Sequence, residues 1–210
     1  MENYKQKFIS LSLEIGALKF GEFQLKSGRI SPYFFNMGLF SSGPLIKNIG
    51  DFYAAALVSS NINYDIVFGP AYKGIPIVTA LASSLSTSYQ LDKPFVYNRK
   101  EVKNHGEGGV TVGEELRGNV VIVDDVITAG TAIREAVDII NNAGATTTGI
   151  VISLDRQERG VGDLSAAKEI SNTLNIPVIS IVNLDEVIDY IDNNPSDYGQ
   201  HIDKIKKYRE

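Results

Sequence analysis

The feature that most constrains the fold is a regular alternation of helical and extended segments between residues 43 and 182. Helical patterns are predicted near residues 43–60, 74–86, 131–143 and 163–174. Strand-like apolar runs follow or separate them: YDIVFG, PFVYN, NVVIV, TTGIVISL and PVISIV, with terminal helices after the last. Strands that alternate with helices form a parallel sheet, because each helix carries the chain back to the same edge. We therefore predict an α/β fold with a parallel sheet flanked by helices.

The N-terminal segment has a different pattern. Apolar residues at spacings of three and four predict an amphipathic helix, and they are Phe8, Leu11, Ile15 and Leu18. We expect this helix to stop near Gly21. Residues 22–35 contain two extended runs joined by a Lys-Ser-Gly turn, which predicts an antiparallel hairpin with Pro32 in an edge strand. The chain is expected to be one domain, residues 1–210, with residues 1–40 forming a small N-terminal hood.

Composition excludes several classes of function. The chain has no cysteine, so disulfides, thiolate zinc sites and a cysteine nucleophile are ruled out, and a reducing cytoplasm fits. His105 and His201 are too far apart to form a helical metal pair. The start of the chain lacks a signal-peptide pattern, and no apolar run approaches the roughly 18 residues that span a bilayer. The formal charge of −5 argues against a broad nucleic-acid-binding face, so we expect neither a membrane nor a nucleic-acid partner.

The stretch NVVIVDDVITAGTAI, residues 119–133, places Asp124 and Asp125 at the end of a buried strand. Small residues follow and lead into a helix, whose N-terminus carries a partial positive charge and unpaired N–H groups. This arrangement predicts a phosphate-binding turn, although it is not a P-loop. Carboxylates accept hydrogen bonds from hydroxyls, so a phosphate beside a diol suggests a sugar phosphate. The alternative is a strand that ends in helix-capping aspartates.

Two further stretches carry positive charge. In GPAYKGIP, residues 69–76, glycines flank Tyr72 and Lys73, so the backbone can approach a phosphate closely; the alternative is a turn with a solvated lysine. In YNRKEVKNHGEGG, residues 97–109, cations run into glycines and predict a mobile loop that closes on an anion. Its cations are Arg99, Lys100, Lys103 and His105. A solvated charged face is the alternative.

A last group of residues suits a planar, anionic ligand. Lys26 lies in the hairpin turn, and Phe34 and Phe35 follow in its second strand. Arg156 ends a strand, and arginine matches a carboxylate with two parallel N–H groups. Aromatic side chains stack on a planar base, so these residues together select an acidic pyrimidine. Hydrophobic packing of the phenylalanines and a surface ion pair of the arginine are the alternatives.

These motifs resemble those of the type I phosphoribosyltransferases, whose signature for phosphoribosyl pyrophosphate (PRPP) matches residues 119–133. The resemblance to orotate phosphoribosyltransferases covers nearly the whole chain, including KFGEFQLKSGRISPYFFN, without departure at the site positions. It implies PRPP binding by Lys26, Tyr72, Lys73, Arg99, Lys100, Lys103, His105, Asp124, Asp125, Val126, Ile127, Thr128, Ala129, Gly130, Thr131 and Ala132. It implies orotate binding by Lys26, Phe34, Phe35, Thr128 and Arg156. It implies catalytic roles for Lys73, Lys100, Lys103, His105 and Asp125.

The resemblance also implies a reaction and a partner. Orotate and PRPP would give orotidine 5′-monophosphate and pyrophosphate, through a state with oxocarbenium character at the anomeric carbon. Mg²⁺ would be held mainly by substrate and water rather than by protein ligands. The family contributes the loop at residues 97–109 across a dimer interface, so a homodimer with shared active sites is expected.

Two other functions remain open at this point. A phosphoribosyltransferase for a purine or for uracil would share the PRPP-binding loops but not the set Lys26, Phe34, Phe35 and Arg156. A PRPP-sensing regulator that binds nucleic acid could use the same fold, since fold does not fix function. Such a regulator would need a basic face, which the net charge does not favour.

Overall fold

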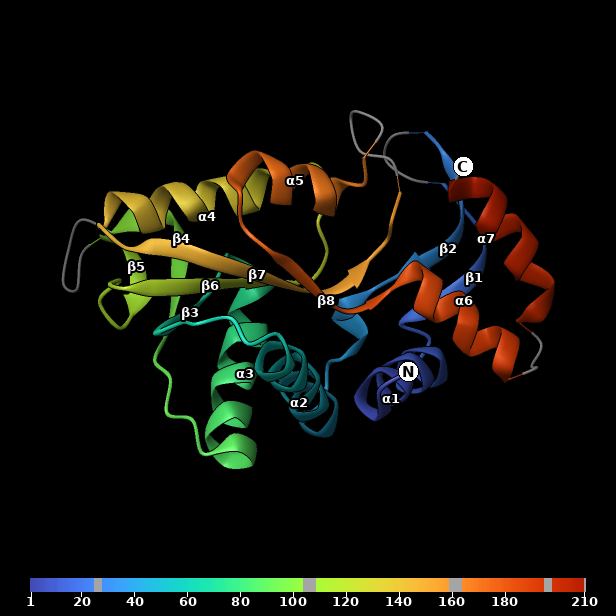
Figure 1. Cartoon of the computed structure of the whole chain (residues 1–210), viewed down its shortest axis with the longest axis horizontal. Helices are drawn as coiled ribbons and strands as arrows, with labels where there is room; N and C mark the ends of the chain where they lie inside the picture. The colour runs from blue at the N-terminus through green and yellow to red at the C-terminus, as the bar shows by residue number, and fades with distance from the viewer. Residues whose placement is uncertain (25–27, 104–108, 159–163, 195–197, 210) are drawn as a thin grey trace.

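The computed structural model describes residues 1–24, 28–103, 109–158, 164–194 and 198–209, and these form a layered α/β structure (Figure 1). Within the described residues, a six-stranded sheet has the strand order β5-β4-β3-β6-β7-β8. Its strands are β3 (Ile66–Gly69), β4 (Phe95–Lys103), β5 (Gly109–Gly113), β6 (Asn119–Asp124), β7 (Thr146–Asp155) and β8 (Val178–Asn183). The predicted α/β fold is confirmed.

The sheet is mostly parallel. Strands β4, β3, β6, β7 and β8 pair in parallel, whereas β5 pairs antiparallel with β4 at the sheet edge. The sequence pattern did not predict β5, and it placed the end of the preceding strand at Asn98, five residues before β4 ends. Residues 99–103 extend β4 beyond its pairing with β3, which ends at Tyr97, and their mostly charged side chains gave no apolar strand pattern.

Helices cover both faces of the sheet (Figure 1). One face carries α4 (Thr131–Asn142) and α5 (Ala166–Leu174), and the other carries α2 (Gly43–Ser59) and α3 (Gly74–Tyr89). Alternate residues of β6 supply the two cores: Val120 and Ile122 pack with α4 and α5, whereas Val121 and Val123 pack with α2 and α3. This double burial explains why the run NVVIV is apolar throughout.

The N-terminal segment begins with α1 (Asn3–Glu14), followed by the antiparallel pair β1 (Leu18–Gln24) and β2 (Ile30–Phe35). It packs beside β8 and the last helices, α6 (Leu184–Asn193) and α7 (Ile202–Arg209). Short 3-10 turns lie at η1 (Met37–Leu39) and η2 (Gly199–His201).

The predicted end of the first helix, near Gly21, is wrong. The helix ends at Glu14, and Gly16 adopts a φ of +70°, the left-handed conformation that commonly follows a helix. Leu18 is the first residue of β1, and its side chain is buried. It fits the helical spacing of the preceding apolar residues only by coincidence. Helix α5 likewise begins at Ala166, after Ser165 caps it, rather than near residue 163.

The strand order has its topological switch point between β3 and β6. From β3 the chain continues to β4 on one side, while β6 pairs on the other side. Loops leaving the carboxyl ends of these two strands diverge, and open α/β sheets bind ligands at this position. In the part of the chain that is described, no helix is long and apolar enough to cross a membrane.

Candidate active site

The turn after β6 leads directly into the N-terminus of α4. Gly130 caps this helix with a φ of +73°, and a Cβ there would lie 2.4 Å from Ile170 Cδ1. Thr128, Ala129 and Thr131 are exposed, so the unpaired N–H groups of the first helical turn face an open surface. This geometry suits a phosphate dianion.

Two of the predicted turn residues have side chains that point into the protein. Ile127 is buried in the core with α4 and α5, and Val126 packs against the opposite core. Ala132 is half-buried in the first turn of α4. Only the backbone of Val126 and Ile127 is therefore placed to contribute to ligand binding.

The paired carboxylates differ in environment. Asp125 is 7% exposed, forms an ion pair with Lys73 and accepts a hydrogen bond from the Val126 N–H at 2.8 Å. Asp124 accepts from the Asp125 N–H at 2.8 Å. Burial, followed by the neighbouring charge of Asp125, raises the pKa of the Asp124 carboxyl from 3.8 to about 7. The hydrogen bond from the Asp125 N–H and the positive charge of Lys73 lower that pKa, but they offset only part of the rise.

Buried groups behind the acids fix the end of β6. The Tyr53 hydroxyl donates to the Asp124 carbonyl at 2.7 Å. Ser153 donates to the Asp125 carbonyl through its N–H at 2.9 Å and its hydroxyl at 2.5 Å. Neither residue was predicted from the sequence. Ser153 is a polar residue inside an apolar strand, and this pattern can indicate a buried hydrogen-bonding role. Tyr53 lies in an ordinary amphipathic helix pattern, which gives no such indication.

The loop after β3 brings Lys73 to the same place. Gly69 and Gly74 approach so closely that a Cβ on Gly69 would lie 2.2 Å from the Gly74 carbonyl oxygen. Buried Asn98, which was not predicted as a site residue either, accepts a hydrogen bond from the Ala71 N–H at 2.7 Å. Tyr72 is 71% exposed. The ion pair of Lys73 with Asp125 joins this loop to the turn after β6, whereas the predicted approach of the loop backbone to a phosphate stays a prediction.

Part of the cationic segment 97–109 is strand. Residues 99–103 belong to β4 and Gly109 begins β5, so the prediction of a mobile loop is wrong for these positions. Arg99 donates to the carbonyl of Thr111 at 3.2 Å, and Lys100 lies 3.6 Å from Glu135 of α4. Lys103 ends β4, and His105 lies outside the described residues.

The residues expected to bind a base come from the hairpin and from the end of β7. Phe34 is 41% exposed and packs against Phe23, whereas Phe35 is half-buried against Phe8. Arg156 follows β7, and its Nε donates to the hydroxyl of Tyr33, the neighbour of Phe34, at 3.2 Å. The structure thus brings Arg156 to the hairpin. Lys26 lies outside the described residues.

Comparison with known proteins identifies the family of the chain. Residues 40–185 fit the model described as the phosphoribosyl transferase domain, and the chain therefore belongs to that class of transferases. A curated orotate phosphoribosyltransferase from Mannheimia succiniciproducens is 52% identical over 100% of this chain and 98% of its own length. One from Marinobacter nauticus is 53% identical over the same shares.

A solved structure agrees with these relatives. The crystal structure of orotate phosphoribosyltransferase from Francisella tularensis has a TM-score of 0.87 and 44% identity, covering 97% of both chains. Within the phosphoribosyltransferase class, the chain belongs to the orotate phosphoribosyltransferases. The family resemblance seen in the sequence motifs is confirmed.

Proposed function

We propose that this chain transfers the 5-phosphoribosyl group of PRPP to N1 of orotate, a step of de novo pyrimidine biosynthesis that leads to UMP. The bond from the anomeric carbon to pyrophosphate breaks, and the bond to N1 forms as N1 loses its proton. The observation that carries the proposal is the contact of Lys73 with Asp125, beside the N-terminus of α4. It joins a cation, two acids and an open phosphate-binding turn at the sheet's topological switch point.

The turn and the acids are assigned to the ribose 5-phosphate part of PRPP. Backbone N–H groups of residues 126–132 would bind the 5′-phosphate, and Asp124 and Asp125 would accept hydrogen bonds from the ribose hydroxyls. Without ligand, the ion pair with Lys73 stabilises the buried negative charge of Asp125. When PRPP binds, its hydroxyls would replace Lys73 at Asp125, and Lys73, whose side chain is 60% exposed, would be released toward pyrophosphate.

The departing pyrophosphate needs several cations. We assign this role to Lys73, Lys100, Lys103 and His105, with Asp125 completing the proposed catalytic set, while Arg99, Lys26 and Tyr72 complete the PRPP contacts. Fixed positive charge stabilises negative charge that develops as the bond to the anomeric carbon breaks. The ion pair of Lys100 with Glu135 of α4, at 3.6 Å between Nζ and Oε2, supports this assignment.

Orotate is assigned to the hairpin side of the site. The exposed side chain of Phe34 and the backbone of Phe35 would line the ring, Lys26 and Thr128 would contact its polar edges, and Arg156 would bind its carboxylate. Exposed Phe34 and the contact between Arg156 and Tyr33 support this placement. Orotate differs from uracil by this carboxylate alone, so a cation is needed for discrimination.

Mg²⁺ is the proposed cofactor. When bound, it would neutralise the charge of the pyrophosphate group. Among the described residues, no cluster of three His, Cys, Asp or Glu side chains could hold a metal, so the protein would supply at most the carboxylates of Asp124 and Asp125. That donor set fits Mg²⁺, which keeps several waters and binds through substrate oxygens.

The assembly and setting of the enzyme are also proposals. We assign residues 1–210 to one domain with residues 1–40 as a hood, in a cytoplasmic homodimer whose 97–109 segments complete each other's sites. The exposed side chain of Tyr72 and an apolar groove of about 460 Å³ beside Lys73 support a partner surface there. Membrane and nucleic-acid partners are not part of the proposal.

Two variants test the residue assignments by calorimetric titration. Asp125→Asn should weaken PRPP binding and turnover, whereas Asp138→Asn, on the exposed face of α4, is the control for loss of one carboxylate charge. Arg156→Ala should lose orotate binding with PRPP binding nearly unchanged. A fully active Asp125→Asn enzyme would remove the ribose assignment, and unchanged orotate affinity in Arg156→Ala would remove the carboxylate assignment.

A further inference from the structure

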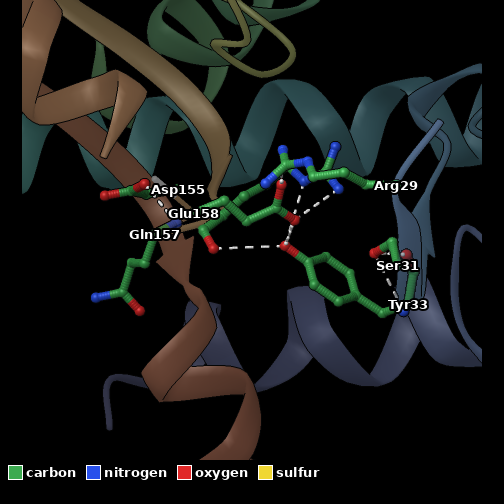
Figure 2. A network of polar contacts seen from close by, with 7 residues as sticks. Arg29, Ser31, Tyr33, Asp155, Gln157 and Glu158 are labelled. Carbon is green, nitrogen blue, oxygen red and sulfur yellow. Dashed lines mark hydrogen bonds and ion pairs between the residues drawn. The ribbon is translucent and has the colours of Figure 1, made fainter. Parts of the chain in front are cut away.

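A polar network joins the hairpin to the end of the central sheet (Figure 2). The hydroxyl of Tyr33, in β2, donates to Glu158 Oε1 at 2.7 Å and accepts from Arg156 Nε at 3.2 Å. Arg156 Nη2 donates to the same oxygen of Glu158 at 2.7 Å. Each of the three side chains therefore contacts the other two.

The network is largely shielded from water. Tyr33 is fully buried, and the side chains of Arg156 and Glu158 are 18% and 11% exposed. Burial would lower the pKa of the Arg156 guanidinium, but Tyr33 and Glu158 outweigh burial and raise it. Hydrogen bonds between charged groups in such surroundings hold side chains more firmly than neutral ones do.

These contacts use one edge of the guanidinium. Nε–H and one N–H of Nη2 lie in the plane of the group and point in the same direction, toward Tyr33 and Glu158. The opposite fork consists of Nη1 and the second N–H of Nη2, and among the described residues no hydrogen bond is recorded for Nη1. A planar fork of this kind matches a carboxylate with two parallel hydrogen bonds.

The charge around the network also favours an anion. Arg29 lies 3.6 Å from Glu158 Oε2, so two guanidiniums share one carboxylate and leave one net positive charge. The Asp155 carboxylate is outside this set of contacts and accepts a hydrogen bond from the Gln157 N–H at 2.9 Å (Figure 2).

We propose that Tyr33 and Glu158 are positioning residues that hold Arg156 with its second fork directed at the substrate carboxylate. This inference rests on the proposed function, in which Arg156 binds orotate. Neither positioning residue needs to touch the substrate. Because Tyr33 adjoins Phe34 in β2, the same network sets the distance between the aromatic wall and the arginine.

Steady-state kinetics with each substrate varied separately test the proposal. Tyr33→Phe removes the hydroxyl between the other two groups, and it should raise KM for orotate about tenfold while changing KM for PRPP and kcat less than about twofold. Glu158→Ala should act similarly. Glu158→Gln keeps a carbonyl oxygen that accepts from both donors, so it should raise KM for orotate about threefold or less.

A matched control separates positioning from general stability. Glu186 is a part-buried glutamate whose ion pair with Lys5, at 2.7 Å, also ties the N-terminal segment to the rest of the fold. Glu186→Ala should lower thermal stability to an extent comparable with Glu158→Ala but leave KM for orotate unchanged. An equal rise of KM for orotate in both variants would overturn the proposal.

The remaining outcomes also distinguish the possibilities. If Glu158 merely competes with orotate as an anion, Glu158→Gln and Glu158→Ala would both lower KM for orotate, and the positioning role would be wrong. If Arg156→Ala loses orotate but Tyr33→Phe and Glu158→Ala keep the wild-type KM, the positioning role fails while the proposed function stands. If the wild-type protein does not use orotate, both fail together.

Discussion

Replacing Asp124 by asparagine should stabilise the folded protein at neutral and alkaline pH while reducing its activity. The carboxyl group is mostly buried beside Asp125, and its pKa is raised from 3.8 to about 7. The asparagine side chain would keep an oxygen that accepts from the Asp125 N–H, while removing the charge. The active site of the wild type therefore keeps a destabilising group that PRPP binding would use.

The magnitude follows from the pKa difference. One pKa unit corresponds to about 1.4 kcal/mol, so the shift from 3.8 to about 7 gives an upper bound of about 4 kcal/mol at pH 8. Because the folded pKa lies above the unfolded one, wild-type stability is lost as pH rises from about 4 through about 7. The buried amide of asparagine also costs free energy, so we expect a gain of about 1–3 kcal/mol at pH 8.

Urea unfolding followed by circular dichroism, at pH 5 and pH 8, measures this effect. The free energy of unfolding of Asp124→Asn minus that of the wild type should be larger at pH 8 than at pH 5. Asp138→Asn, at an exposed position of α4, controls for the change in net charge and should show little pH dependence. An Asp124→Asn difference that is the same at both pH values, or that decreases toward pH 8, would contradict a raised pKa of the Asp124 carboxyl in the folded protein.

Three further predictions concern the geometry of the site. Gly130→Ala should lower the free energy of unfolding by about 1–3 kcal/mol, because φ at this position is +73° and the added Cβ would meet Ile170. It should also weaken PRPP binding measured by calorimetry, and wild-type affinity would contradict this. Tyr53→Phe should lower the free energy of unfolding in urea by about 1–2 kcal/mol, since the Asp124 carbonyl at the end of β6 loses its hydrogen-bond donor. An unchanged urea midpoint would contradict this. Mixing inactive Lys73→Ala and Lys103→Ala chains under exchange conditions should restore part of the activity if sites are shared, and no recovery would exclude sharing.

The alternating core of the chain could be predicted from its sequence. Strands such as NVVIV are buried on both faces, and their continuous apolar character is a local signal that does not depend on distant contacts. The ion pair of Lys73 with Asp125 is a tertiary contact between the loops after β3 and β6, which the parallel strands bring to one edge of the sheet.

What the sequence did not reveal depends on tertiary partners. The run VTV in β5 consists of β-branched residues that favour a strand, but it is only three residues long between two glycines, and its pairing with β4 is set by the fold. Glu158 reads as one charge in the stretch DRQERG, and only the fold shows that it contacts Tyr33, 125 positions away. The buried roles of Asn98 and Tyr53 are likewise set by backbone groups far away in the sequence.

Transfer to orotate can be followed by the absorbance of orotate after the protein is mixed with PRPP and Mg²⁺, with uracil in a parallel reaction. We expect loss of orotate absorbance with release of pyrophosphate, and a preference for orotate over uracil on the order of 10⁴ or more, because an unpaired buried arginine penalises the substrate that lacks the carboxylate. No change with orotate, or equal use of uracil, would contradict it.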